Sequence, residues 1–358
     1  MSAARLVDAA RASFAAARRS AASGELDGQL AGHAVRFEFA GDFFAPQLTR
    51  ALAIDSSPAR QAAGEPALTM HAWDAGSTGV RLDSDSWAGL MINSSSVIEE
   101  MSDERYQVSL ELHGALASIL DRVTGEAYHY VPDPRRLPAW ETTHPARVLL
   151  ATWARDQGLV TCHAAAVADD DAGLLLCGGS RAGKSTTTLA CLAAGMRAAG
   201  DDYVLVEPGA PPIVHALYRS TLLELDNYQR NERLMPVVDH VADQADRRKA
   251  VMFADGADRP LIAGGFSIRG LVALHVVRGS RPSYRRASGA AALRALAPST
   301  LSQLGMVDAA GLARLADLCR SVPAFDMQLG DDPAPVPDLL RQVIAEARAA
   351  TTAVAVHA

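Results

Sequence analysis

The sequence contains very little lysine. It has 34 basic residues, of which only Lys184 and Lys249 are lysine, and all the others are arginine. Arginine therefore serves wherever a general positive charge is sufficient. A retained lysine indicates a position that favours a compact, flexible ammonium group over a planar guanidinium. Both lysines are therefore candidate functional residues, although for Lys249 a solvated surface position explains the residue equally well.

Other scarcities exclude whole classes of protein. Every apolar run is too short to span a bilayer, and the net charge of −7 argues against a basic face for nucleic acid. The four cysteines, Cys162, Cys177, Cys191 and Cys319, show neither C-x-x-C nor zinc-ligand spacing and indicate no disulfides. We therefore expect a cytoplasmic protein that binds neither nucleic acid nor membrane.

The first third of the chain has the alternating polar and apolar pattern of half-buried strands. It begins with an alanine- and arginine-rich segment, for which an amphipathic helix is favoured over a transit peptide. Turn residues separate the strands, which predicts an antiparallel, strand-rich α+β domain over residues 1–135 without a catalytic constellation. The proline-rich residues 131–138 are the predicted linker. The candidate strands are 33–39, 67–73, 106–112, 115–120 and 126–131, and a short helix is expected near 46–54.

Residues 178–185 carry the most informative motif in the chain. Their sequence, Gly-Gly-Ser-Arg-Ala-Gly-Lys-Ser, fits the phosphate-binding P-loop pattern G-x-x-x-x-G-K-[ST]. An apolar run at 173–177 predicts a strand before it, and an alanine- and leucine-rich run at 185–194 predicts a helix after it. Lys184 would reach the β- and γ-phosphates and Ser185 would bind Mg²⁺. A chance match in a glycine-containing chain is the alternative, but both flanking elements favour the P-loop.

Two further features surround this motif. The Asp201-Asp202 pair opens a predicted strand at 203–207, and His163 lies in a predicted strand at 160–168 that an acidic turn joins to the strand before the P-loop. In phosphoryl transfer one carboxylate accepts the hydroxyl proton and another contacts Mg²⁺. Adjacent residues at a strand start point to opposite faces, so the two roles can be divided. A polar turn for the pair and a buried core histidine remain the alternatives.

The run from Cys162 to Glu207 resembles the kinase domain of the HPr kinase/phosphorylase family. The shared pattern is a histidine followed by Gly or Ala, a short turn, a strand, the P-loop, a helix and an Asp-Asp pair. Downstream, the resemblance is weaker and includes Tyr218-Arg219-Ser220 and Lys249-Ala250-Val251. The N-terminal part is more similar to divergent HPr-kinase-related proteins, some of which modify ribosomally made peptides.

This resemblance implies an α/β fold, namely a P-loop kinase domain of the HPr kinase and phosphoenolpyruvate carboxykinase type over residues 144–350. It implies transfer of the γ-phosphoryl group of ATP, with Mg²⁺, to a serine or similar hydroxyl of a protein or peptide, a ribosomally made precursor peptide being one candidate. The catalytic residues it implies are Asp201, Asp202, Lys184 and His163, and the metal ligands are Ser185 and Asp202. The nucleotide contacts it implies are Gly178, Ser180, Arg181, Ala182, Gly183, Lys184, Ser185 and Thr186, with Arg219 and Lys249 as further candidates.

The sequence also departs from the family pattern. The regulatory enzymes carry Ser-Gly inside the P-loop and an acidic residue after the motif serine, whereas here Arg181 follows Ser180 and Thr186 follows Ser185. The second, glycine-rich family signature is absent, so dephosphorylation of a substrate is not expected. A kinase of a small-molecule hydroxyl and a non-catalytic ATP-sensing module remain alternatives. Homo-oligomer formation, which is common in the family, stays open.

The last part of the chain predicts the remaining elements of the kinase domain. We expect strands at 271–277, 283–287 and 322–329, and a frayed tail at 351–358. The expected helices are 290–296, 299–304, 309–320 and 336–350.

Overall fold

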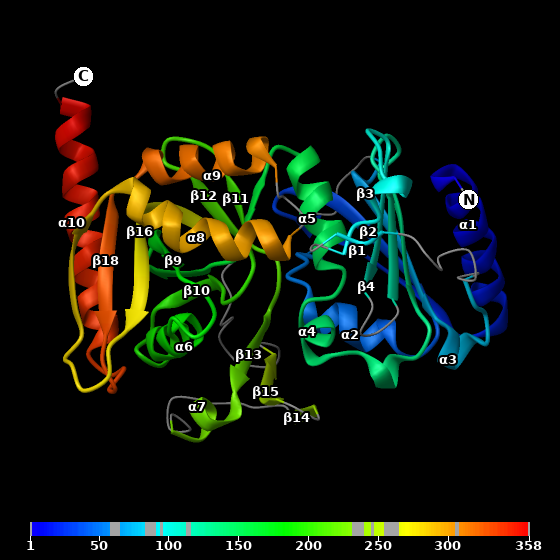
Figure 1. Ribbon diagram of the computed structural model, residues 1–358, viewed down its shortest axis with the longest axis horizontal. Helices are drawn as coiled ribbons and strands as arrows, with labels where there is room; N and C mark the ends of the chain where they lie inside the picture. The colour runs from blue at the N-terminus through cyan, green and yellow to red at the C-terminus, as the bar shows by residue number, and fades with distance from the viewer. Residues whose placement is uncertain are drawn as a thin grey trace. The chain divides into compact units, whose positions relative to one another are not determined.

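The computed structural model divides the chain into two compact units, Met1–Gln157 and Gly158–Ala358 (Figure 1). No described helix is both long and apolar enough to cross a membrane. The structure describes residues 2–57, 65–82, 91–93, 96–111, 116–230, 240–244, 247–253, 265–304 and 308–356.

The first unit contains a mixed sheet whose described strands run in the order β1-β2-β3-β6-β5-β4. The outer pairs are antiparallel, but β2 and β3, and β3 and β6, are parallel. The predicted antiparallel sheet is therefore wrong at its centre, because parallel neighbours need crossovers and an alternating pattern does not report strand direction. The elements are α1 (Ala3–Ser20), β1 (Ser23–Leu30), β2 (His33–Ala40), α2 (Phe44–Ala51), β3 (Leu68–Asp74), α3 (Ala75–Thr78), η3 (Glu99–Met101), β4 (Tyr106–Glu111), β5 (Leu116–Asp121), β6 (Glu126–Val131), η4 (Pro134–Arg136), α4 (Ala139–Thr143) and α5 (Arg147–Asp156).

Helix α5 belongs to the first unit, whereas the sequence analysis assigns its residues to the second domain. Its Trp153 is buried, and the indole Nε1 donates to the Ala67 carbonyl at 3.2 Å. At its end, Asp156 accepts two hydrogen bonds from Arg122, at 2.7 and 2.6 Å. The boundary therefore lies at Gly158, beyond the proline-rich segment, because α5 packs on the first sheet.

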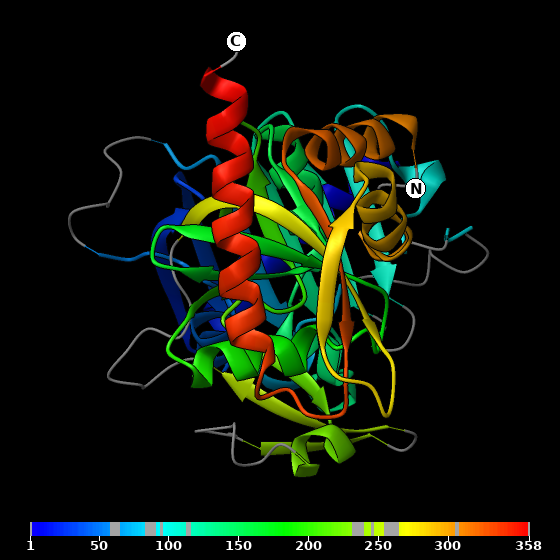
Figure 2. The same cartoon turned by 90° about the vertical axis from the view of Figure 1, so that its left-hand side faces the viewer.

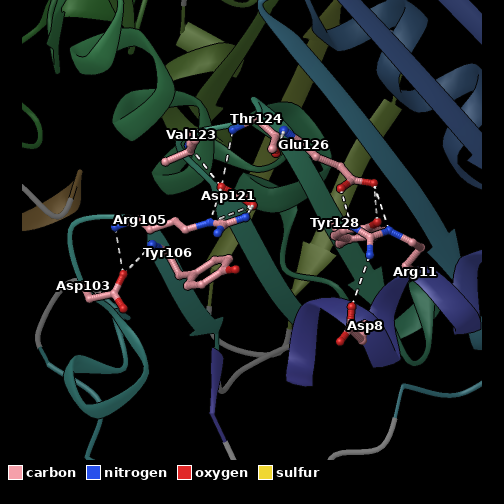
Figure 3. A network of polar contacts seen from close by, with 10 residues as sticks. All are labelled: Asp8, Arg11, Asp103, Arg105, Tyr106, Asp121, Val123, Thr124, Glu126 and Tyr128. Atoms are coloured by element: carbon pink, nitrogen blue, oxygen red, sulfur yellow. Dashed lines mark hydrogen bonds and ion pairs between the residues drawn. The ribbon is translucent and has the colours of Figure 1, made fainter. Parts of the chain in front are cut away.

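Two ion-paired clusters hold elements of the first unit together, one within the sheet and one between the sheet and α1 (Figure 3). Asp121, whose side chain is 3% exposed, accepts a hydrogen bond from Arg105 Nη2 at 2.8 Å and from two turn N–H groups. Burial opposes its ionisation, but Arg105 and these N–H groups outweigh burial and hold the pKa of Asp121 below its usual range. Arg11 on α1 donates to Glu126 Oε2 at 2.6 Å, so α1 is held by charge as well as by its buried apolar face.

The second unit is built on a larger mixed sheet and a separate sheet of order β13-β15-β14. In the larger sheet β16 is parallel to β9 and to β18, while β8 pairs antiparallel with β9 and with β10. The elements are β7 (Val160–Cys162), β8 (Ala165–Asp169), β9 (Ala172–Cys177), α6 (Lys184–Ala193), β10 (Arg197–Gly200), β11 (Val204–Glu207), β12 (Ile213–Ala216), β13 (Ser220–Glu224), α7 (Leu225–Arg230), β14 (His240–Gln244), β15 (Arg247–Phe253), β16 (Gly265–Val276), β17 (Ser283–Ala287), α8 (Gly289–Gln303), α9 (Ala309–Ser321), β18 (Ala324–Leu329) and α10 (Val336–Val356).

Helices cover both faces of the larger sheet. Leu175 and Cys177 of β9 share one core with apolar residues of α8 and α9, whereas Leu174 and Leu176 share the other core with apolar residues of α6 and α10. Successive residues of a strand point to opposite faces, so this division follows from the strand itself. Figure 2 shows α10 lying along the sheet. The second unit is therefore a three-layer α/β structure.

Three predicted boundaries in this unit are wrong. The predicted strand at 160–168 is two strands, because β7 pairs with β11 whereas β8 pairs with β9. The two predicted helices at 290–304 form one helix, α8, which continues through Pro298 because Leu296, Ala297 and Thr300 are buried and hold it in place. The tail expected to fray continues α10 to Val356.

Candidate functional site

Three loops meet at one edge of the larger sheet. The loop of residues 178–183 follows β9 directly, and the Asp201-Asp202 pair follows β10. The first residue of β8, Ala165, pairs with Leu176 near the end of β9, and the next residue, Ala166, pairs with Gly200 at the end of β10. The ends of β9 and β10 therefore lie at the same level of the sheet. His163 occupies the break between β7 and β8 at this same level. The carboxyl ends of such strands are where α/β proteins bind ligands.

The backbone of the 178–183 loop requires glycine at two positions. Gly183 has φ of 98° and begins helix α6, and a Cβ at this position would overlap the Leu329 side chain. A Cβ at Gly178 would lie 2.6 Å from the Ala182 Cβ and 3.2 Å from the Leu274 carbonyl oxygen. The motif glycines therefore allow a tight strand-to-helix loop whose helix N-terminus carries partial positive charge. The loop has the form of an anion cradle.

Lys184 folds back over this loop. Its ammonium Nζ donates to the Gly178 carbonyl at 2.9 Å and to the Gly179 carbonyl at 3.3 Å, and the residue is 6% exposed. A positive charge is thus buried inside the loop, beside the N-terminus of α6. A phosphate oxygen would be a stronger partner for this ammonium than neutral carbonyls are, because its negative charge attracts the positive charge of the ammonium directly.

Asp201 is the most unusual group at this edge. It is 2% exposed, and in the part of the chain that the structure describes neither carboxylate oxygen makes a hydrogen bond of good geometry, although the Ser185 and Thr188 hydroxyls lie close enough to act on it. Burial and the adjacent Asp202 raise the pKa of Asp201 to about 7, while the Ser185 hydroxyl, Lys184 and the Thr188 hydroxyl favour its ionised form. A buried carboxylate whose nearby donors are poorly aligned is costly. Its place beside Ser185 and Lys184 fits a site that is completed by a cation.

Asp202 faces a histidine. The His163 Nε2 lies 3.5 Å from Asp202 Oδ1, and the ring packs on Tyr203 with centroids 5.2 Å apart. Helix α8 anchors His163 and Tyr203. The backbone N–H of His163 donates to Thr300 Oγ1 at 3.0 Å, and the Tyr203 hydroxyl donates to Gln303 Oε1 at 2.6 Å. A carboxylate next to an imidazole is an arrangement suited to proton transfer.

The remaining predicted residues lie in the loop itself, at the start of α6, and on or next to the sheet of β13, β15 and β14. Ser180 and Arg181 are exposed, and Arg181 Nη2 lies 4.0 Å from Glu224 Oε1 on β13. Arg219 is partly buried and immediately precedes β13. Lys249 pairs with Glu224 in the backbone register of β13 and β15, but its side chain lies outside the described part of the chain. Ala182 and Thr186 are partly buried.

Sequence reasoning missed four residues of this neighbourhood: Thr188, Tyr203, Thr300 and Gln303. The signal for Thr188 is present, because it lies four residues after Lys184 on one helix face, and its hydroxyl donates to the Lys184 carbonyl at 3.1 Å. Thr300 and Gln303 are far from the motif in sequence, and nothing in their local pattern indicates the contact.

The donors at this edge fit magnesium. Among the described residues there is no group of three or more His, Cys, Asp or Glu side chains that could hold a metal ion. Mg²⁺ needs no such group, because it is usually bound by one or two carboxylates together with substrate phosphates and water. Asp201 and the Ser185 hydroxyl are donors of that kind.

Comparison with known proteins adds little to this geometry. No protein-family model matches the chain, and no curated protein matches it. Among solved structures, the HPr(Ser) kinase/phosphatase from Coxiella burnetii is similar over 52% of this chain and 97% of that chain, with 11% sequence identity and a TM-score of 0.28. A likeness of this size carries no conclusion about the activity, which rests on the site itself.

Proposed function

We propose that the second unit is an ATP-dependent phosphotransferase that carries the γ-phosphoryl group to a hydroxyl acceptor, with Mg²⁺. The observation that carries this proposal is the buried Asp201 carboxylate, which makes no hydrogen bond of good geometry in the described chain, beside Ser185 and Lys184 of a glycine loop. A P-loop that only bound an anion would gain nothing from burying a negative charge at its base. A carboxylate that shares a cation with phosphate oxygens explains the arrangement.

Different residues of the site would bind the phosphates, hold the metal ion and accept the proton. The backbone N–H groups of the loop and the Lys184 ammonium hold the phosphates, and Ser185 and Asp201 are the residues placed to hold Mg²⁺. Bound there, Mg²⁺ would neutralise charge on the phosphates. The sequence analysis gives the metal role to Asp202, but Asp201 is the carboxylate that faces Ser185. Asp202, beside His163, is then the group that accepts the proton of the acceptor hydroxyl.

We propose a serine hydroxyl of a protein or peptide as the acceptor, with a ribosomally made precursor peptide as one candidate. The resemblance of the 162–207 run to serine kinases supports this choice. A small-molecule hydroxyl is the alternative acceptor. An ATP-sensing module without transfer is disfavoured, because binding alone needs no carboxylate–imidazole pair.

The proposal is tested by comparing Asp202→Asn with Asp201→Asn. We expect Asp202→Asn to keep Mg·ATP binding and to lower phosphoryl transfer about 10² to 10⁴-fold, which is the usual contribution of a general base. We expect Asp201→Asn to remove the Mg²⁺ dependence of nucleotide binding. Asp171→Asn is the matched control, since Asp171 is exposed in the turn between β8 and β9.

Transfer is measured with γ-labelled ATP on serine-containing peptides and, separately, on small hydroxyl compounds. Label on a peptide serine supports the proposed acceptor, and label only on a small molecule supports the alternative. Equal transfer rates for Asp202→Asn and Asp171→Asn would refute the assignment of the base. Tight ATP binding with no transfer to any acceptor would favour the sensing module.

A further inference from the structure

The first unit contains a cavity that the proposed kinase chemistry does not use. Its volume is about 430 Å³, within the range of small-ligand sites. One wall is the short segment that follows β3, and the other is the turn that follows β6. The lining residues are Ala75, Gly76, Gly79, Arg81, Pro132, Asp133, Arg135 and Arg136.

The lining is strongly positive although the whole chain is acidic. It contains three guanidinium groups and a single carboxylate. Asp133 is engaged by Arg135 in a forked pair, with Nε to Oδ1 at 2.9 Å and Nη2 to Oδ2 at 3.1 Å. Among the lining residues, Arg81 and Arg136 therefore bring two positive charges in excess, although the buried Asp74 carboxylate lies directly behind one wall. An anion that enters this space would meet these guanidinium groups.

The walls are held in place before any ligand arrives. Asp74 is fully buried and caps the segment, because Oδ1 accepts from the Ser77 N–H at 2.7 Å and Oδ2 accepts from the Ser77 hydroxyl at 2.6 Å. The residues that face the cavity here are small, and a Cβ added at Gly79 would meet no atom within 4 Å. On the other wall, prolines at 132 and 134 restrict the backbone. The cavity is therefore bounded by two backbone segments whose conformations are already fixed.

Arg81 is also oriented by its surroundings. Burial raises the pKa of the Tyr130 hydroxyl, and the Arg81 guanidinium beside that hydroxyl opposes the shift. Tyr130 is 4% exposed and lies on β6, in the centre of the sheet. The guanidinium of Arg81 is therefore tied to the rigid core, although the residue is exposed.

We propose that this cavity binds a dianionic phosphate group through Arg81 and Arg136. Guanidinium forks match the geometry of phosphate oxygens, and two guanidinium groups can share the charge of a dianion. The group belongs either to a free phosphate compound or to a phosphorylated residue of a peptide. The inference rests on the first unit alone and does not depend on the kinase proposal.

The test must separate this cavity from the P-loop, which also binds phosphate. The full chain carrying Lys184→Ala is therefore titrated with inorganic phosphate at constant ionic strength in a calorimeter. We expect this variant to keep one phosphate site, and expect the affinity to fall at least about 10-fold when Arg81→Gln and Arg136→Gln are added. Arg5→Gln, an exposed arginine at the other end of α1 from this region, is the control and should leave the affinity unchanged.

Both arginines are exposed, and the unfolding temperature of each variant is compared with that of the parent to show that the fold is intact. A phosphoserine peptide that binds more tightly than inorganic phosphate assigns the site to a phosphorylated residue, and equal affinities assign it to a free phosphate compound. The proposal is overturned if the Lys184→Ala variant binds no phosphate, or if the two glutamine substitutions weaken binding no more than Arg5→Gln does.

Discussion

The glycine loop allows a quantitative prediction that compares alanine substitutions at two of its glycines, Gly183 and Gly179. Alanine at position 183 must adopt φ near 98° and place a Cβ against Leu329, which is 5% exposed. The left-handed backbone costs roughly 1–2 kcal/mol for a residue with a Cβ. Moving the Leu329 side chain adds about 1 kcal/mol, the low end for overpacking because the atom met is the end of a flexible side chain. We expect Gly183→Ala to lower the free energy of unfolding by about 2–3 kcal/mol in total.

The matched control is Gly179→Ala. A Cβ at Gly179 would meet no atom within 4 Å, and its φ is not positive. Thermal unfolding should therefore separate the two variants by several degrees, since about 1 kcal/mol shifts the melting temperature of a domain this size by roughly 2–4 °C. Calorimetric titration with Mg·ATP should show at least about a tenfold loss for Gly183→Ala, because a loop displaced by even about 1 Å loses its phosphate geometry. Equal stability and equal ATP affinity in the two variants would refute the reasoning.

Three further predictions concern other parts of the molecule. Asp121→Asn should lower the free energy of unfolding by about 1–3 kcal/mol while the exposed control Asp8→Asn stays neutral. Because the pKa of Asp121 is depressed in the fold, this difference should be complete at neutral pH and disappear in denaturant titrations as the pH falls through that pKa. If Lys249 contacts phosphate, Lys249→Arg should lower kcat by up to about 10²-fold, whereas Arg248→Lys should leave kcat unchanged. Wild-type kinetics for both variants would show that Lys249 is a solvated surface residue. Thr300→Val keeps the shape of the side chain but removes the acceptor of the His163 N–H, so we expect about 1–3 kcal/mol of destabilisation in thermal unfolding; an unchanged melting temperature would show that this contact is replaced.

The local features of the site could be read from the sequence because neighbouring residues determine them. The predicted strand at 173–177 and the predicted helix at 185–194 are confirmed by β9 and α6. The glycine at position 183 has the positive φ that its motif position leads one to expect. An amphipathic N-terminal helix is confirmed by α1, whose buried residues lie on one face.

The features that depend on distant pairing could not be read in this way. Alternation gives the faces of a strand but not its partners, so the parallel centre of the first sheet and the break between β7 and β8 were missed. The resemblance gives the metal role to Asp202, but the sequence itself does not show which of the two adjacent carboxylates faces Ser185. Only the packing shows that one is buried against Ser185 while the other faces His163. The roles proposed for the individual site residues stay predictions.

The central claim is that the loop before α6 and the Asp201 carboxylate together hold Mg·ATP. The most direct measurement is calorimetric titration of the full chain with ATP, with Mg²⁺ and with EDTA, for the wild type, Lys184→Ala and Asp201→Asn. The account predicts that Mg·ATP binds to the wild type, that Lys184→Ala weakens binding in both buffers, and that Asp201→Asn removes the difference between the buffers. Failure of the wild type to bind ATP, or unchanged affinity in Lys184→Ala with its fold intact, would contradict it.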